Sequence, residues 1–79
     1  MRYETTTTLA PEAALAAAEQ FFGDEFGLKV RQRGPQMIGF EGGGGHVAIS
    51  VAGERPTTLE IETREWDAAV TEFMGKLPR

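Results

Sequence analysis

Apolar and polar residues alternate along four short segments in the second half of the chain. The segments are Leu28–Arg33, Met37–Glu41, His46–Ala52 and Thr58–Thr63. Side chains of a strand point alternately to its two faces, so this period of two predicts four strands with one apolar face. Residues 34–36 (Gly-Pro-Gln) and 53–56 (Gly-Glu-Arg-Pro) are rich in turn-forming residues and predict tight connections.

The beginning of the chain predicts a strand followed by a helix. Tyr3–Leu9 is rich in threonine, and the branched threonine side chain favours a pleated sheet. Pro11 suits the first turn of a helix, where its missing N–H group is not needed. Glu12–Phe22 is rich in alanine, the strongest helix former, and predicts a helix with a thin apolar face.

The end of the chain predicts an amphipathic helix. Its apolar residues recur at helical spacing: Trp66, Ala69, Val70, Phe73, Met74 and Leu77. Thr63 is the expected N-cap, and Pro78 should stop the helix. We therefore expect this helix to be essential to the core of the protein.

The register of the predicted strands follows from their apolar faces. A slip of one residue would reverse every side chain, so inward residues must pair with inward residues. The predicted partners are Ile38 with Ile49, Phe40 with Val47, Glu41 with His46, Val51 with Leu59, Ile49 with Ile61, Lys29 with Glu41, and Arg31 with Gly39. The strand at Tyr3–Leu9 can then add beside the strand at Thr58–Thr63.

These elements predict a single α+β domain over residues 1–79, in the order β-α-β-β-β-β-α. Both helices are amphipathic, so both should cover the apolar face of a curved antiparallel sheet in a two-layer sandwich. In element order the chain resembles a small helix-grip or TATA-binding-like arrangement, with the C-terminal helix lying along the sheet. Helix-grip proteins often bind apolar ligands, which is what the resemblance implies for function.

The run Glu41-Gly-Gly-Gly-Gly-His46 predicts a turn rather than a ligand loop. Glycine supplies positive φ angles, and the register leaves residues 42–45 as a four-residue connection. A phosphate loop would open a helix and carry Lys followed by Ser or Thr, whereas this run opens a strand. Glu41 and His46 could form an acid–base pair, but at the end of a strand on the outer face we expect a surface ion pair.

Composition and charge exclude several classes of protein. The chain has no cysteine and one histidine, so we expect neither a disulfide nor a metal centre, and no cofactor. Its net charge of −4 opposes binding to nucleic acid. No apolar run approaches the ~20 residues that span a bilayer, and no secretion signal is evident, so we expect a soluble cytoplasmic protein with no membrane partner. Glu60 and Glu62 alternate on a strand without the spacing of a calcium loop.

We therefore expect a non-enzymatic, self-associating structural or interaction module that forms a homodimer. The outer face is predicted to read Arg33–Met37–Ser50–Glu60 and Arg31–Gly39–Ala48–Glu62, with a small centre between a basic and an acidic border. The interface candidates are Met37, Gly39, Ala48, Ser50, Arg31 and Glu62. Paired edge strands are another route to a dimer.

The alternative function is the binding of a small apolar ligand between the sheet and the C-terminal helix. The residues predicted to line such a pocket are Trp66, Phe73, Phe40 and Phe22. On a chain of this length, aromatic residues at helical spacing are more often core. An enzyme built on Glu41 and His46 is the weakest hypothesis, because no nucleophile accompanies them.

Overall fold

A computed structural model describes all residues from Met1 to Arg79. The chain folds into five strands and two helices, and the first helix continues into a π-helical segment, η1. The bounds are β1 Arg2–Thr7, α1 Pro11–Ala18, η1 Glu19–Glu25, β2 Lys29–Gly34, β3 Met37–Gly42, β4 Gly45–Ala52, β5 Thr57–Arg64 and α2 Asp67–Lys76. The predicted α+β fold and its order of elements are confirmed.

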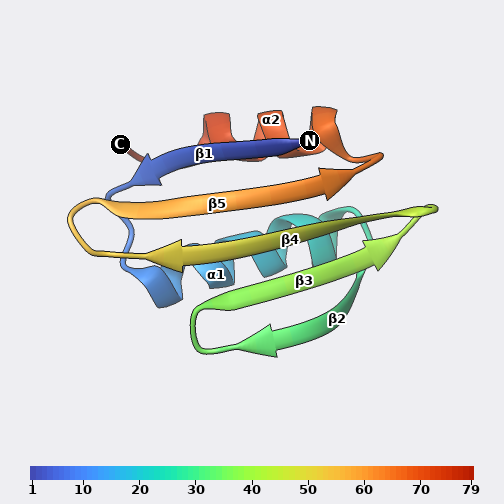
Figure 1. The fold of residues 1–79 in the computed structure, drawn as a ribbon, viewed down its shortest axis with the longest axis horizontal. Coiled ribbons are helices and arrows are strands. Elements are labelled where there is room, and N and C mark those ends of the chain that lie inside the picture. The colour runs from blue at the N-terminus through green and yellow to red at the C-terminus, as the bar shows by residue number, and fades with distance from the viewer.

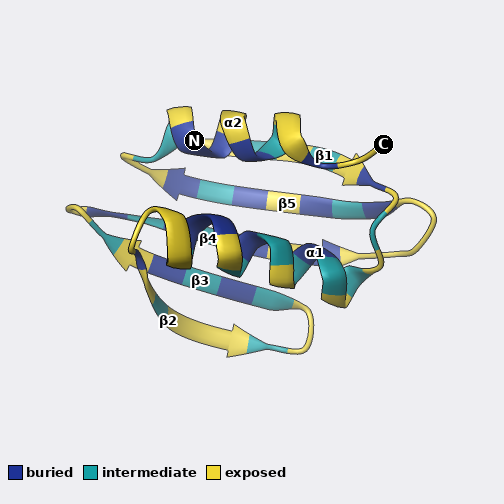
Figure 2. Ribbon diagram, turned by 180° about the vertical axis from the view of Figure 1, so that it is seen from behind, coloured by how far each residue is buried: buried dark blue, intermediate teal, exposed yellow.

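The five strands form one open antiparallel sheet in the order β1-β5-β4-β3-β2. Both helices lie on the same side of the sheet, as predicted, with α1 behind β3 and β4 and α2 behind β1, past whose outer edge it projects (Figures 1 and 2). The opposite side carries no helix, and we call it the open face. No helix is long and apolar enough to cross a membrane.

The core lies between the sheet and the two helices, where the inward side chains of the alternating strands meet the apolar helix faces (Figure 2). Phe22 is fully buried, and its ring lies 5.5 Å from that of Phe40 and 5.3 Å from that of Phe73. The buried polar side chains are Thr7, Thr57 and Thr63, and each donates a hydrogen bond to a backbone oxygen. The core therefore contains no unsatisfied buried polar side-chain atom.

The predicted register is confirmed for β3, β4 and β5, and β1 does lie beside β5. It is wrong in the second half of β2. Lys29 pairs with Glu41 as predicted, but a bulge between Val30 and Gln32 sets Gln32, not Arg31, opposite Gly39. The extra residue of a bulge changes the face of the residues that follow it. Arg33 consequently lies opposite Ile38, on the helix side, and is absent from the open face.

The first helix is longer than predicted, because it widens at η1 instead of ending at Phe22. A hydrogen bond from the Phe26 amide to the Phe21 carbonyl spans five residues, which is the spacing of a π-helix. Two consecutive residues of this segment, Phe21 and Phe22, are buried together with their rings edge to face at 4.9 Å.

The second helix begins later than predicted. It starts at Asp67, and Trp66 occupies the N-cap position without a capping side chain. Thr63, the expected cap, is a buried residue of β5 whose hydroxyl donates to the His46 carbonyl. Trp66 therefore lies before the helix rather than on its apolar stripe, and the Trp66 indole Nε1 donates to the Gly42 carbonyl at 2.9 Å.

Candidate functional site

The open face carries the polar side chains of the sheet around a centre of small residues. Two rows cross it in register from β2 to β1. One row contains Gln32, Gly39, Ala48, Glu62 and Arg2, and the other contains Gly34, Met37, Ser50, Glu60 and Glu4. The predicted small centre of Met37, Gly39, Ala48 and Ser50 is present on β3 and β4. The two rows differ from the prediction at their β2 ends, because of the bulge.

The basic border of the open face lies on β2 and is smaller than predicted. Arg33 turns to the helix side, where its guanidinium forms two hydrogen bonds of 2.9 Å with the Glu19 carboxylate. Arg31 forms an ion pair of 3.1 Å with Glu41, and both side chains remain exposed. Lys29 takes part in none of the four ion pairs of the chain. It is therefore the unpaired cation of this border.

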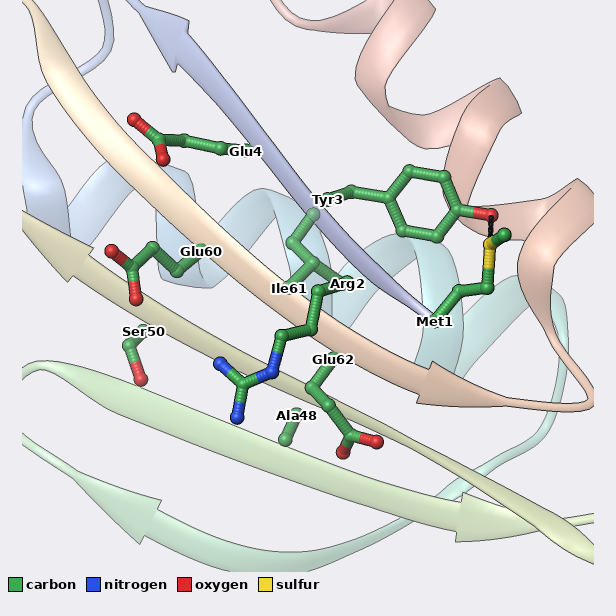
Figure 3. A pocket seen from close by; sticks show the side chains of 9 residues that line it. All are labelled: Met1, Arg2, Tyr3, Glu4, Ala48, Ser50, Glu60, Ile61 and Glu62. Atoms are coloured by element: carbon green, nitrogen blue, oxygen red, sulfur yellow. Dashed lines mark hydrogen bonds between the residues drawn. The ribbon is translucent and has the colours of Figure 1, made fainter.

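The acidic side of the open face is hollowed over β5 (Figure 3). The hollow has a volume of about 780 Å³, with Ala48 and Ser50 of β4 on one side and Arg2 and Glu4 of β1 on the other. Figure 3 shows Arg2 extending across β5, whereas Tyr3 points away toward α2. Three carboxylates, those of Glu4, Glu60 and Glu62, line the hollow together with this single guanidinium. Glu4 and Glu60 are direct cross-strand partners, and the repulsion between two like charges in these positions destabilises the sheet of a single chain.

His46 is paired with Glu62, not with Glu41 as predicted. His46 and Glu41 do lie opposite each other in the backbone register. However, the imidazole Nε2 lies 2.6 Å from the Glu62 carboxylate across the diagonal to β5, and Glu41 turns to Arg31. The hydrogen bond with His46 lowers the pKa of Glu62, and the positive charges of His46, the N-terminus and Arg2 act in the same direction. Both side chains are about two-fifths exposed, so this is a surface pair.

The lowered pKa of Glu62 predicts a contribution to stability that acid removes. A carboxylate whose pKa is lower in the folded chain stabilises it above the unfolded value of about 4.3, and the contribution is lost as the pH falls through the folded pKa. Between about pH 5 and pH 3, the free energy of unfolding should therefore fall less in Glu62→Gln than in wild type. Urea unfolding at each pH, followed by the fluorescence of Trp66, measures this. Glu60→Gln is the control, because Glu60 lies on the same strand but is not paired with His46. An equally reduced fall in the free energy of unfolding of Glu60→Gln would contradict the prediction.

Each glycine of the run 42–45 has a separate structural requirement, and the expected four-residue connection is in fact a two-residue turn. Gly42 pairs with Gly45, and Gly43 and Gly44 form the turn with φ angles of +59° and +80°. Two positive φ values are typical of the type I′ hairpin turn. A Cβ on Gly42 would lie 2.6 Å from the Leu28 side chain, and one on Gly45 would lie 2.1 Å from the Arg64 carbonyl oxygen. The run is therefore a turn, as predicted, but its glycines are not interchangeable.

The residues predicted to line an apolar pocket are mostly packed against one another. Phe22, Phe40 and Phe73 are buried, and their rings fill the middle of the core. Phe73 is the one of these residues that lines a groove, that of about 220 Å³ between the helices. Trp66 lies at the end of the core, edge to face with the partly exposed Phe26 at 5.8 Å.

Sequence reasoning did not place the β1 residues Arg2 and Glu4 on the open face. The signal was present, because even-numbered residues of β1 must share one face once Tyr3 is assigned inward. Four consecutive threonines obscured the alternation. The pairing of Trp66 with Gly42 had no local signal, since it joins residues 24 positions apart.

The chain was compared with models of known protein families and with curated proteins, and neither comparison found a match. The function therefore has to be inferred from the geometry and the charges of the chain itself.

Proposed function

We propose that this protein is a non-enzymatic module that associates with a second copy of itself through the open face. The observation that carries the proposal is the layout of this face: small residues at the centre, a basic border on β2 and an acidic hollow over β5. A homodimer with twofold symmetry presents the same patch twice, so the patch must be self-complementary. Opposite charges on the two sides of a flat centre meet that condition.

The charges select one orientation of the twofold axis. An axis parallel to the strands, between β3 and β4, places β2 of one copy over β5 of the other. Lys29 lies in the row of His46 and Arg64, so it approaches the end of the other copy's hollow where Glu62 is the nearest carboxylate. An axis perpendicular to the strands would place each strand over its own equivalent, and the acidic residues of β5 would face each other. We infer the parallel axis.

The same axis places β3 over β4 at the centre. Gly39 of one copy then lies over Ala48 of the other, and neither has a long side chain that would hold the sheets apart. The two longer dimensions of the molecule, 34 and 23 Å, lie in the plane of the sheet in Figure 1. A face of that size can supply the roughly 800 Å² per partner of a stable interface. A chain of 79 residues also has a small core, which association would supplement.

Sedimentation equilibrium at micromolar concentration tests the proposal. We expect wild type to self-associate, and we expect Ala48→Arg to raise the Kd of the face-to-face contact about a hundredfold or more, because the arginine would be buried without a partner. Ala16→Arg is the matched control: Ala16 is exposed on α1, on the other side of the sheet, and the same substitution there should leave the dimer intact.

Charge reversal tests the orientation of the axis. Lys29→Glu should weaken the dimer, and adding Glu62→Lys should restore it, because the pair would then attract again with exchanged signs. A wild type that is monomeric throughout ends the proposal. Association that is unchanged from wild type in Ala48→Arg contradicts the open face as the interface.

A further inference from the structure

The two edges of the sheet differ in how they resist pairing with another strand. The β2 edge carries Lys29 and Arg31 and contains the bulge after Val30, and both features are common protections of an edge strand. The β1 edge has no bulge, and its charged residues, Arg2 and Glu4, lie in its first half. Its six residues pair with β5 without a bulge, and its second half is uncharged threonine. A flat, regular edge of this kind is a template for another strand.

The hydrogen-bonding groups that β1 presents to its outer side can be assigned. The Met1 ammonium donates to the Thr63 carbonyl at 2.7 Å, and the Thr63 amide donates to the Met1 carbonyl at 2.9 Å. This mutual pair fixes the alternation of an antiparallel ladder, so the odd-numbered residues of β1 bond to β5. The amides and carbonyls of Arg2, Glu4 and Thr6 therefore point outward. The next outward amide, that of Thr8, already donates to the Pro78 carbonyl at 3.1 Å.

The side of α2 next to β1 is lined by small residues. The Tyr3 hydroxyl donates to the Asp67 carboxylate at 2.9 Å, and the Thr71 hydroxyl, one turn further along α2, donates to the Asp67 carbonyl at 3.0 Å. Gly75 lies one turn after Thr71 on the same side of the helix. A Cβ at Gly75 would meet no atom within 4 Å, so nothing in the single chain requires a glycine there. Glycine weakens a helix relative to alanine, and an approaching helix is one reason to retain it.

We propose that the outer edge of β1 pairs with the β1 strand of a second copy, antiparallel about a twofold axis normal to the sheet. The sheets would join through the outward groups of Glu4 and Thr6, and the two α2 helices would pass each other at Thr71 and Gly75. This interface is separate from the open face, although it serves the same self-association.

The register about Thr5 makes the strand self-complementary. Outward residues must pair with outward residues, and an axis at Thr5 sets Glu4 of each copy opposite Thr6 of the other. An axis at Glu4 would instead oppose the two Glu4 carboxylates, which is unfavourable. An axis at Tyr3 would bring the two Asp67 carboxylates together at the starts of the α2 helices. Of these three registers, the one about Thr5 avoids both contacts.

The two interfaces together predict an assembly that does not close. The twofold axis of the open face runs along the strands between β3 and β4, whereas the axis of the edge is normal to the sheet beyond β1. These axes do not intersect, and a closed tetramer with two such axes requires that they do. Each copy would therefore contact one neighbour through its face and another through its edge, which gives an open chain of copies.

Thr6→Pro tests the edge, because proline removes an outward N–H group and leaves the odd-numbered ladder to β5 intact. Thr6→Val retains the N–H group and is the control. In sedimentation experiments we expect species larger than dimers for wild type and for Thr6→Val. Thr6→Pro and Ala48→Arg should each leave dimers, and the double variant should be a monomer. Circular dichroism and Trp66 fluorescence of each variant check that it remains folded.

The outcomes separate this interface from the open face. If Ala48→Arg alone gives a monomer at every concentration, the edge proposal is overturned and the face stands. If Ala48→Arg gives a dimer that Thr6→Pro does not weaken, the edge proposal is also overturned. If Thr6→Pro is a monomer while Ala48→Arg self-associates as wild type does, the edge interface is supported and the open-face interface is contradicted.

Gly75→Ala is a second test that does not depend on a proline in a strand. The added methyl group should raise the urea midpoint of the monomer, because alanine favours the helix. In the Ala48→Arg background it should weaken the edge dimer at least tenfold, since the methyl group would lie between the two α2 helices. A change in the urea midpoint without a change in the Kd would remove α2 from the interface and overturn the proposal as stated.

Discussion

Replacing Gly45 by alanine should destabilise the protein by about 3 kcal/mol, the upper part of the range for overpacking in a well-packed site. Gly45 is buried, and a Cβ there would lie 2.1 Å from the Arg64 carbonyl oxygen and 2.7 Å from the Glu65 Cβ. Both are fixed parts of β5 or of the residue after it, so no flexible side chain can move aside. The two strands would have to separate at the end of the hairpin.

Gly44→Ala is the matched control for this prediction. Gly44 has a φ angle of +80°, but a Cβ there would meet no atom within 4 Å. Its replacement should cost about 1 kcal/mol, from the left-handed backbone alone. Urea unfolding followed by the fluorescence of the single tryptophan compares the two variants directly. Equal losses would show that backbone conformation, and not the close approach of β5, governs the whole run.

The register of the sheet could be predicted from the sequence where each strand has one buried face. Ile38, Phe40, Val47 and Ile49 alternate with polar or small residues, and only one alignment pairs them inward. β2 offers less information, because Val30 is its only large apolar residue and three charged residues alternate along it. Nothing in that pattern indicates a bulge, so the faces of Arg31 and Arg33 could not be predicted.

Contacts between distant segments limited the prediction of the site. The sequence indicated that residues 42–45 form a turn, because glycine is common in hairpins. It did not indicate that Leu28, Arg64 and Trp66 approach this turn so closely that side chains are excluded from it. Likewise, the cross-strand position of His46 and Glu41 was correct, but the side chain of His46 has a carboxylate on each neighbouring strand. The choice of Glu62 depends on the twist and side-chain rotamers of the folded sheet.

Replacing Phe22 by alanine should cost about 4 kcal/mol, within the range for buried phenylalanines. The Phe22 ring is fully buried and contacts the rings of Phe21, Phe40 and Phe73 from three different elements. Its loss would leave a cavity at the junction of η1, β3 and α2. The effect approaches the whole stability expected of a small domain, so the variant should be largely unfolded near its physiological temperature.

Phe26→Ala is the control, because Phe26 belongs to the same segment of chain but its side chain is 39% exposed. We expect it to cost about 1 kcal/mol, in proportion to the smaller apolar area that it buries. The comparison also distinguishes the core from a ligand pocket. If Phe22 lined a pocket for an apolar ligand, its truncation would cost the unliganded protein little, and hydrophobic compounds would raise the melting temperature of wild type. A large loss in Phe22→Ala without such a rise in wild type would mean that the aromatic cluster holds the helices to the sheet.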